Sequence, residues 1–168
     1  MRSIYKIVVC SLLTLSITSC EKDLLEKEQY QKEIYLIGAY NRVWTTEVSY
    51  SDEEVKTYFT VSSSGTLALD QDVNVKMKIN EELVDIYNKK YWTVLNEDKY
   101  YKSLDTDLYS IPSLENTVIK HAEGISAEVP VLIKTASLKI DQSYVIPVEI
   151  ESTTVYPISA SGRKMLFY

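Results

Sequence analysis

Three aromatic residues in one polar stretch are the strongest candidates for chemistry at a surface. Trp92, Tyr100 and Tyr101 lie within residues 91–112, which show neither strand nor helix periodicity. Aromatic rings stack on the apolar C–H faces of sugars, while indole N–H and phenol O–H groups reach hydroxyls. With Trp44, near the start of an expected strand, they form a candidate glycan-binding set. The alternative is that these rings fill the core or cover sheet edges, as is usual in β-sandwiches.

The other polar residues give little support for catalysis or metal binding. His121 is the only histidine, and no serine lies in a nucleophile-elbow pattern, so it is expected in a surface turn. The spaced carboxylates of residues 70–72 and 105–107 lack the full EF-hand pattern. Carboxylate pairs for glycoside hydrolysis depend on separation in space, so a small hydrolase is the least supported hypothesis. No catalytic residue, metal or cofactor is predicted.

Cys20 has a different chemistry, which its neighbours define. Arg2 and Lys6 precede an apolar run that is too short to span a bilayer. Small residues then lead into the cysteine, and residues 15–20 (LSITSC) resemble a bacterial lipobox. In that interpretation residues 1–19 form a lipoprotein signal peptide, and Cys20 receives lipid on its sulfur and its amine. The alternatives are an ordinary signal peptide, or a buried hydrophobic strand followed by a chance cysteine.

Residues 20–32 are expected to form a lipidated tether that holds the domain at 33–168 off the membrane. They are highly charged and show no strand pattern. Glu21, Lys22 and Asp23, directly after the cysteine, resemble the signal that sends Bacteroidota lipoproteins to the outer face of the outer membrane. The alternative is a solvated linker that carries no export signal. The expected location is therefore the outer membrane, at the cell surface.

Charge and cysteine content exclude several classes of protein. The formal net charge is −6, and removal of Arg2 and Lys6 makes the chain more acidic. A nucleic-acid partner is not expected, because phosphates need a basic face. The lipid must supply membrane anchoring, since an acidic chain is not attracted to an anionic surface. With Cys10 removed and Cys20 lipidated, no cysteine remains for a disulfide, a thiol nucleophile or a metal site.

Short strands account for most of residues 33–168. The clearest covers 72–80, where Val73, Val75, Met77 and Ile79 alternate with polar residues. Further strands are expected at 34–37, 43–50, 55–62, 118–120, 127–135, 144–150 and 163–168. Regular alternation of strands and helices is absent, so the pattern predicts one all-β sandwich rather than a parallel α/β sheet.

One short helix is expected at residues 81–88. Asn80 is a favourable N-cap, and acidic residues in the first turn suit the helix dipole. Leu83, Ile86 and Tyr87 recur at helical spacing, so this face is predicted to pack over one edge or end of the sheet.

Two prolines interrupt predicted strands. Pro130 lies on the outward face of the strand whose residues Val129 and Val131 face inward, and Pro147 interrupts residues 144–150 in the same way. Because proline has no N–H to donate to a neighbouring strand, each is predicted to mark a sheet edge or a bulge.

An ordered set of features supports a family resemblance. It comprises VNVKM at 73–77, Tyr87-Asn88, Tyr109, TVI at 117–119, Gly124, the 129–133 strand and YVIPVEI at 144–150. Behind a lipobox, this set resembles the N-terminal Ig-like domain of unknown function of Bacteroidota surface lipoproteins. The resemblance extends from about Glu33 to the end of the sequence.

The resemblance implies an Ig-like antiparallel β-sandwich and a place in a polysaccharide-utilisation system. Such proteins often carry a second, glycosidase-like or lectin-like module, whereas this sequence ends at Tyr168. The leading hypothesis is a non-catalytic surface lipoprotein that assists glycan binding or capture. The alternative is a structural or protein-interaction module that docks on a partner lipoprotein, a transporter or another outer-membrane protein, or a host surface.

Overall fold

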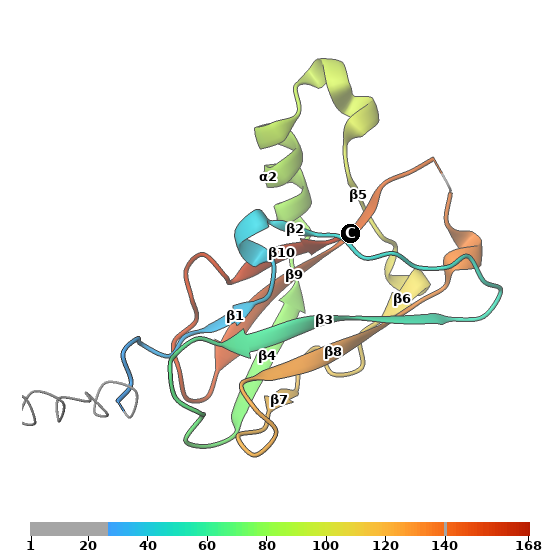
Figure 1. The fold of residues 1–168 in the computed structure, drawn as a ribbon. Coiled ribbons are helices and arrows are strands. Elements are labelled where there is room, and N and C mark those ends of the chain that lie inside the picture. Colours follow the sequence, from blue (N-terminus) through green and yellow to red (C-terminus); the bar gives the residue numbers. More distant parts are fainter. Residues whose placement is uncertain (1–26, 140) are drawn as a thin grey trace, which may run out of the picture.

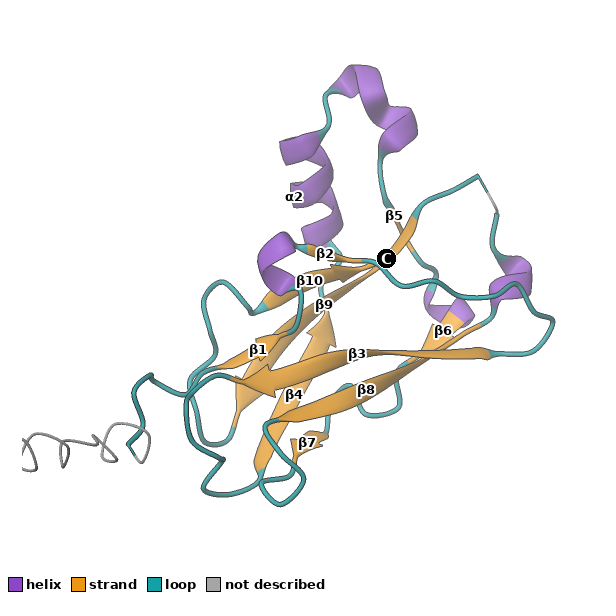
Figure 2. Ribbon diagram, viewed as in Figure 1, coloured by secondary structure: helices purple, strands orange, loops and turns teal. Residues whose placement is uncertain are grey.

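A computed structural model describes residues 27–139 and 141–168 as two packed β-sheets (Figure 1 and Figure 2). Cys20 and the expected signal peptide lie outside the described residues. The first sheet has four strands, all antiparallel, in the order β1 (Ile34–Leu36), β3 (Val55–Ser63), β8 (Ser126–Ile133) and β6 (Tyr109–Ser110).

The second sheet carries six strands. Five follow the order β2 (Val43–Trp44), β10 (Lys164–Phe167), β9 (Tyr144–Thr153), β4 (Val73–Ile79) and β7 (Thr117–Ile119). The sixth, β5 (Lys102–Ser103), pairs with the start of β9. The β2–β10 and β5–β9 pairs are parallel, and the others are antiparallel. Two sheets and one short α-helix among the described residues confirm the predicted all-β sandwich.

The core lies between the sheets and follows from the alternation of the strands. Val73, Val75 and Met77 of β4 are fully buried, while the polar residues between them are exposed. They belong to the same cluster as Phe59 and Val61 of β3, in the other sheet. Burying an aliphatic or aromatic side chain contributes about 1.5–3 kcal/mol, so this two-sided layer is the main source of stability.

Pro130 confirms the edge prediction for its part of β8. It pairs with Tyr58 of β3 on one side. On the other side β6 reaches β8 only at Leu132 and Ile133, so at Pro130 the described residues supply no second partner strand.

Pro147 marks neither a sheet edge nor a bulge, and that prediction is wrong. The irregular pairing of β9 with β4 lies elsewhere, opposite the step between Lys76 and Met77. It lies within β9, opposite Leu166 of β10, and its carbonyl accepts a hydrogen bond from the Asn80 N–H at 2.9 Å. The matching acceptor for a residue-147 N–H would be the Asn80 carbonyl. That oxygen instead accepts from the Leu83 N–H at 3.1 Å, where the helix begins. The missing N–H therefore leaves no acceptor unsatisfied.

The helix α2 (Glu82–Tyr91) begins one residue after the predicted start and extends three residues beyond the predicted end. The Asn80 side-chain oxygen accepts from the Glu82 N–H at 3.2 Å, which supports the predicted cap. Helix α2 projects from one end of the sandwich (Figure 2) and contacts β9 and β10.

The predicted apolar face of α2 is only partly correct. Leu83 and Tyr87 pack against a small cluster of Val84, Val145 and Leu166. Ile86, however, is 58% exposed, and Val84 takes its place as the buried aliphatic residue. Helix α2 contacts only β9 and β10, so the apolar stripe that it buries is narrower than that of a helix packed across a whole sheet.

The strand predicted at residues 43–50 ends after Trp44, because β2 pairs only with β10 at Leu166 and Phe167. Other connections form short 3₁₀ helices. They are η3 (Ala39–Asn41), η4 (Val94–Lys99), η5 (Thr106–Leu108) and η6 (Thr135–Ser137). Within residues 91–112, the two 3₁₀ helices η4 and η5 and the two-residue strands β5 and β6 confirm the predicted irregular stretch.

Part of the expected tether contacts the sandwich. The Lys32 ammonium, 9% exposed, donates to the Ala68 carbonyl at 2.6 Å and to Asp70 Oδ2 at 3.3 Å. The Glu28 carboxylate accepts hydrogen bonds from the Thr66 and Leu67 N–H groups. Within the described residues, no helix has the length and apolar character needed to cross a membrane.

Candidate functional site

A row of four tyrosine rings crosses the end of the sandwich that carries α2. Ring centroids are 4.5 Å apart for Tyr91 and Tyr87, 5.4 Å for Tyr87 and Tyr101, and 5.4 Å for Tyr101 and Tyr168. These tilted contacts are the favourable geometry for aromatic pairs. Burial raises the pKa of Tyr87 and of Tyr101, so both phenols stay protonated at neutral pH.

Asn88 fixes the segment that carries Tyr101 to the helix. Its side-chain Nδ2 donates to the Tyr101 carbonyl at 2.9 Å, and its Oδ1 accepts from the Tyr101 N–H at 3.0 Å. Asn88 is 4% exposed, so its side chain takes the place of water as the hydrogen-bond partner of the Tyr101 N–H and carbonyl. Tyr101 is therefore held in place as part of the row of rings rather than presented as a free side chain.

Trp92 and Tyr100 lie on either side of η4. The Trp92 ring is half-buried, and the Lys99 ammonium lies 5.6 Å from its centroid. The Trp92 indole nitrogen is buried and has no hydrogen-bond partner among the described residues. Tyr100 is half-buried and lines a groove together with Tyr101.

Trp44 lies on β2, at the edge of the second sheet. Its ring packs against Gly38, which begins η3 with a positive φ of 84°. A side chain at residue 38 would overlap the Trp44 ring, so glycine is required by both backbone conformation and contact. Trp44 is 39% exposed and lines neither of the two grooves near α2.

The first groove, the α2–β5 groove, has a volume of about 750 Å³ between the helix and the segment around β5. Tyr100 and Tyr101 line it, together with the acidic side chains of Glu81, Glu82, Asp85 and Glu97. Carboxylate oxygens accept hydrogen bonds from hydroxyl groups, and tyrosine rings offer apolar faces. The arrangement is therefore suited to a neutral polyhydroxylated ligand.

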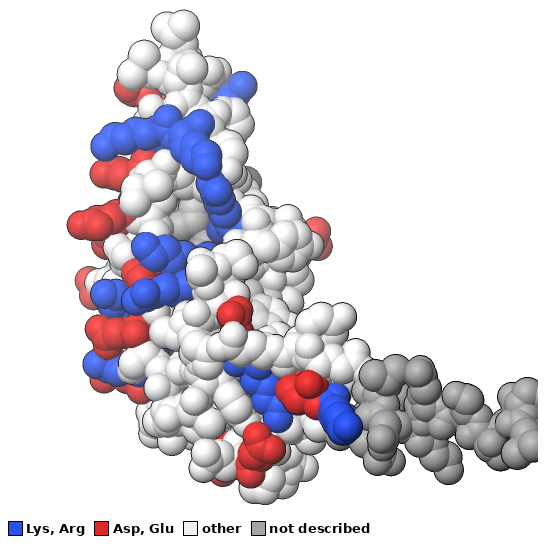
Figure 3. All heavy atoms as spheres, turned by 90° about the vertical axis from the view of Figure 1, so that its left-hand side faces the viewer, with Lys and Arg blue, Asp and Glu red and all other residues white. Residues whose placement is uncertain are grey.

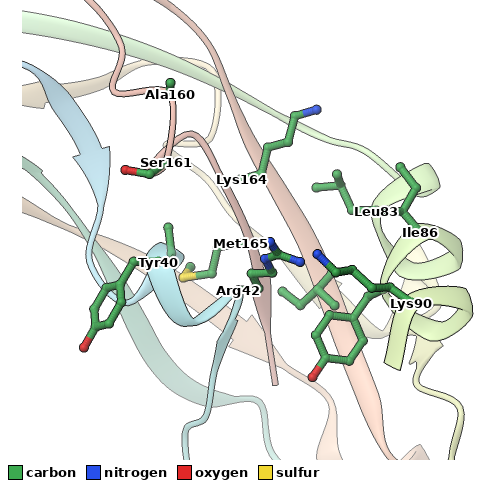
Figure 4. Close-up of a pocket in the computed structure, with 12 residues that line it drawn as sticks. Tyr40, Arg42, Leu83, Ile86, Lys90, Ala160, Ser161, Lys164 and Met165 are labelled. Atoms are coloured by element: carbon green, nitrogen blue, oxygen red, sulfur yellow. The ribbon is translucent and has the colours of Figure 1, made fainter. Parts of the chain in front are cut away.

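The second groove, the α2–η3 groove, has a volume of about 500 Å³ and separates α2 from η3 and β10 (Figure 4). Its floor is apolar, from Leu83, Met165 and Leu166. Tyr40, 77% exposed, lies at its η3 side. Its cationic side chains are those of Arg42, Lys90 and Lys164.

The structure thus brings Tyr100 and Tyr101 together in the α2–β5 groove. Trp92, which follows α2 directly, and Trp44, on β2, line neither groove. Tyr40 and Arg42 were missed, because the expected elements gave no reason to bring the η3 segment near the helix. The glycine at 38 is the available signal, since glycine between apolar runs marks a tight turn.

The remaining polar candidates lie away from both grooves. His121, 53% exposed, follows β7 in a turn as predicted, and its Nδ1 is 2.7 Å from Asp72 Oδ1. This hydrogen bond lowers the pKa of Asp72. In residues 27–139 and 141–168, no three His, Cys, Asp or Glu side chains gather closely enough to hold a metal ion.

Several solved structures share this fold. A Bacteroides ovatus protein of unknown function matches 82% of the chain at 18% identity, with a TM-score of 0.67. The Bacteroides thetaiotaomicron protein EndoBT-3987, solved with a Man5GlcNAc product, matches 80% at 18% identity and a TM-score of 0.57. An auxiliary nutrient-binding protein of the same species matches 77% at 13% identity and a TM-score of 0.58.

The chain spans less than half of each of these proteins, covering 45%, 29% and 44% of their lengths. A search of curated proteins found no match. Residues 30–157, well over half of the chain, match the family model described as "-like, N-terminal domain". Together with the Bacteroides structures, this confirms the resemblance to an N-terminal domain of Bacteroidota proteins of unknown function, and the chain belongs to this N-terminal domain family.

Proposed function

We propose that this chain is a non-catalytic lipoprotein domain of the bacterial surface, anchored in the outer membrane by lipid on Cys20, which assists glycan capture. The observation that carries the proposal is the pair of grooves beside α2, both lined by tyrosine rings and polar side chains. Such convergence of aromatic and polar groups in a concave surface is typical of small-ligand sites.

The structural relatives give independent support at the level of the family. One is described as an auxiliary nutrient-binding protein, and another was solved with a glycan product. Their identity to this chain is low, so the likeness shows the fold alone. The proposal for this chain rests on its own grooves, and the expected polysaccharide-utilisation context agrees with these relatives.

The alternative function is a protein-interaction module. Exposed apolar side chains favour it, since Val94 and Leu95 of η4 are 75% and 90% exposed at the projecting end. Exposed apolar residues that cluster on a surface are typical of docking sites. In this alternative the tyrosine row stabilises the end of the sandwich and no glycan is bound.

A glycan-array and affinity-gel screen tests the proposal on the full chain purified in detergent. Specific retention on a polysaccharide that falls in Tyr100→Ala and Tyr101→Ala, whose side chains line the α2–β5 groove, supports glycan capture at the α2 end. Tyr58→Ala is the matched control, because Tyr58 is 53% exposed on β3, in the other sheet. Absence of retention on plant, host and microbial glycans would refute glycan capture. A stoichiometric partner in a pull-down would then establish the interaction module.

A further inference from the structure

The α2–η3 groove is cationic in an acidic protein. Arg42, Lys90 and Lys164 line it, and its lining includes no Asp or Glu. The whole chain carries a formal charge of −6, so a groove without carboxylates departs from the average surface. Figure 3 shows a band of Lys and Arg side chains across the upper half of the face that looks out to the left in Figure 1.

Two of these cations share one aromatic ring. The Arg42 guanidinium carbon lies 5.7 Å from the Tyr91 centroid, and Lys90 Nζ lies 5.6 Å from it. Figure 4 shows Lys90 extending from α2 toward Arg42. Among residues 27–139 and 141–168, neither cation forms an ion pair. Two like charges at one ring repel each other, and an anion between them would relieve the repulsion.

Arg42 is held in an unusual backbone conformation. Its φ is 67°, and it is the only non-glycine residue with positive φ in the described part of the chain. Its N–H donates to the Ala39 carbonyl at 2.8 Å, and its own carbonyl accepts from the Leu166 N–H at 2.7 Å. A non-glycine residue in this region costs free energy, and such residues cluster at ligand sites.

The Arg42 guanidinium keeps donors available for a ligand. Its Nη1 donates to the Tyr91 hydroxyl at 2.8 Å, and this is its only side-chain hydrogen bond to the described residues. A guanidinium has five N–H donors in a planar fork that matches carboxylate or sulfate oxygens. Tyr40 lies at the η3 side of the same groove, with its exposed ring directed away from Arg42 and Lys90 (Figure 4).

We propose that the α2–η3 groove binds an anionic sugar residue of a polysaccharide, with its carboxylate or sulfate between Arg42 and Lys90. This inference rests on the proposed glycan-capture function and names its substrate class. Lys164 adds positive charge from β10, although its ammonium also lies 3.8 Å from Glu149 Oε1.

The test compares two neighbouring lysines on α2. Lys90→Gln removes a cation that lines the groove, and Lys89→Gln removes an exposed cation that does not line it, with the same change in net charge. The full chain in detergent is titrated at about 0.15 M salt, where distant charges are screened. The probes are polygalacturonate for carboxylate, carrageenan for sulfate, and dextran and mannan as neutral polymers.

We expect Lys90→Gln to weaken binding to at least one anionic polymer by about tenfold, as loss of a charge-assisted contact does, and Lys89→Gln to leave it within about twofold. The polymer that responds identifies the anionic group. Equal loss in both variants would mean non-specific attraction and would overturn the inference. Binding to neutral polymers alone would also overturn it while leaving glycan capture intact. Binding to none of the four polymers would overturn the inference, and the glycan array described above then decides glycan capture separately.

Discussion

Asn88 illustrates how one buried polar side chain positions a surface. It lies on α2 and satisfies both backbone groups of Tyr101, which the chain reaches only after η4. With these two bonds, the buried Asn88 side chain acts as a clamp between α2 and the β5 segment. The α2–β5 groove, which both elements line, therefore depends on it.

Replacing Asn88 by alanine should destabilise the protein by about 2 kcal/mol, because it leaves a half-buried N–H and C=O without partners. Urea unfolding monitored by circular dichroism measures the change. Asn96→Ala is the control, since the Asn96 amide bonds only the Thr93 hydroxyl at the surface. It should alter the free energy of unfolding by less than about 0.5 kcal/mol. Equal effects of both variants would contradict the clamp.

Glu28 predicts a pH dependence for the attachment of the N-terminal segment. The hydrogen bond from the Thr66 N–H, with those from Leu67 and Tyr30, lowers the Glu28 pKa from 4.5 to about 2. Between these values the unfolded chain binds a proton that the folded chain does not, so folding loses this stabilisation as the pH falls from 4.5 toward 2.

The melting temperature of the wild-type chain should therefore exceed that of Glu28→Gln above pH 4.5, and the difference should shrink as the pH falls toward 2. The amide keeps the shape of the side chain but not its charge, so it is the matched comparison. Thermal melts of both proteins at half-unit pH steps measure the difference. A gap that stays constant across this range would show that the carboxylate is not held by these bonds.

At the scale of elements, η3 depends on a contact with β2. Gly38 starts η3 with positive φ, and its missing side chain leaves room for the Trp44 ring. Tyr40 and Arg42 follow directly, so the η3 wall of the α2–η3 groove is set by this one close approach. The Tyr91 ring, at the end of α2, contacts Arg42 from the opposite side.

Gly38→Ala should cost about 1–3 kcal/mol more than Gly124→Ala, because residue 124 also has positive φ but no atom within 4 Å of an added Cβ. Urea unfolding gives both costs. In a Trp92→Phe background, Trp44 is the only tryptophan, so its fluorescence should shift in Gly38→Ala and stay unchanged in Gly124→Ala. Equal costs in the two variants would show that η3 does not depend on the Trp44 contact.

At the scale of the whole molecule, sequence periodicity predicts where the strands lie in the sequence better than which strands pair in the sheets. Residues 72–80 predict β4 to within one residue at each end, because burial on one face repeats along the strand. The edge prediction for Pro147 was wrong because the Asn80 carbonyl, which would otherwise accept a hydrogen bond from residue 147, accepts one from the Leu83 N–H at the start of α2. Local patterns do not carry that information.

The candidate site shows the same limit. The sequence groups Trp92, Tyr100 and Tyr101 because they are close in the chain, and the structure keeps them at one end of the sandwich. Arg42, Lys90 and Lys164 come from three segments that are far apart in the sequence, and no local pattern predicts that they line one groove. Long-range packing of β10 against β2 and α2 creates it.

The placement of the grooves leads to a prediction about the intact cell. The first described residues enter the sandwich at the lower left of Figure 1, whereas α2 projects from its upper end. If lipid on Cys20 anchors the chain, the helix end extends away from the point of attachment. A surface-facing lipoprotein would then expose Ser161, an exposed residue of the α2–η3 groove, to the medium.

Ser161→Cys makes this testable, because the sequence after Cys20 contains no other cysteine and, in the proposed lipoprotein, lipid blocks the Cys20 thiol. A membrane-impermeant maleimide should label Ser161→Cys on intact cells as strongly as on permeabilised cells. Additional replacement of Cys20 by alanine should move the protein out of the membrane fraction, because several acyl chains supply the stable anchoring. Labelling only after permeabilisation would place the domain on the periplasmic side. Membrane retention without Cys20 would refute the lipid anchor.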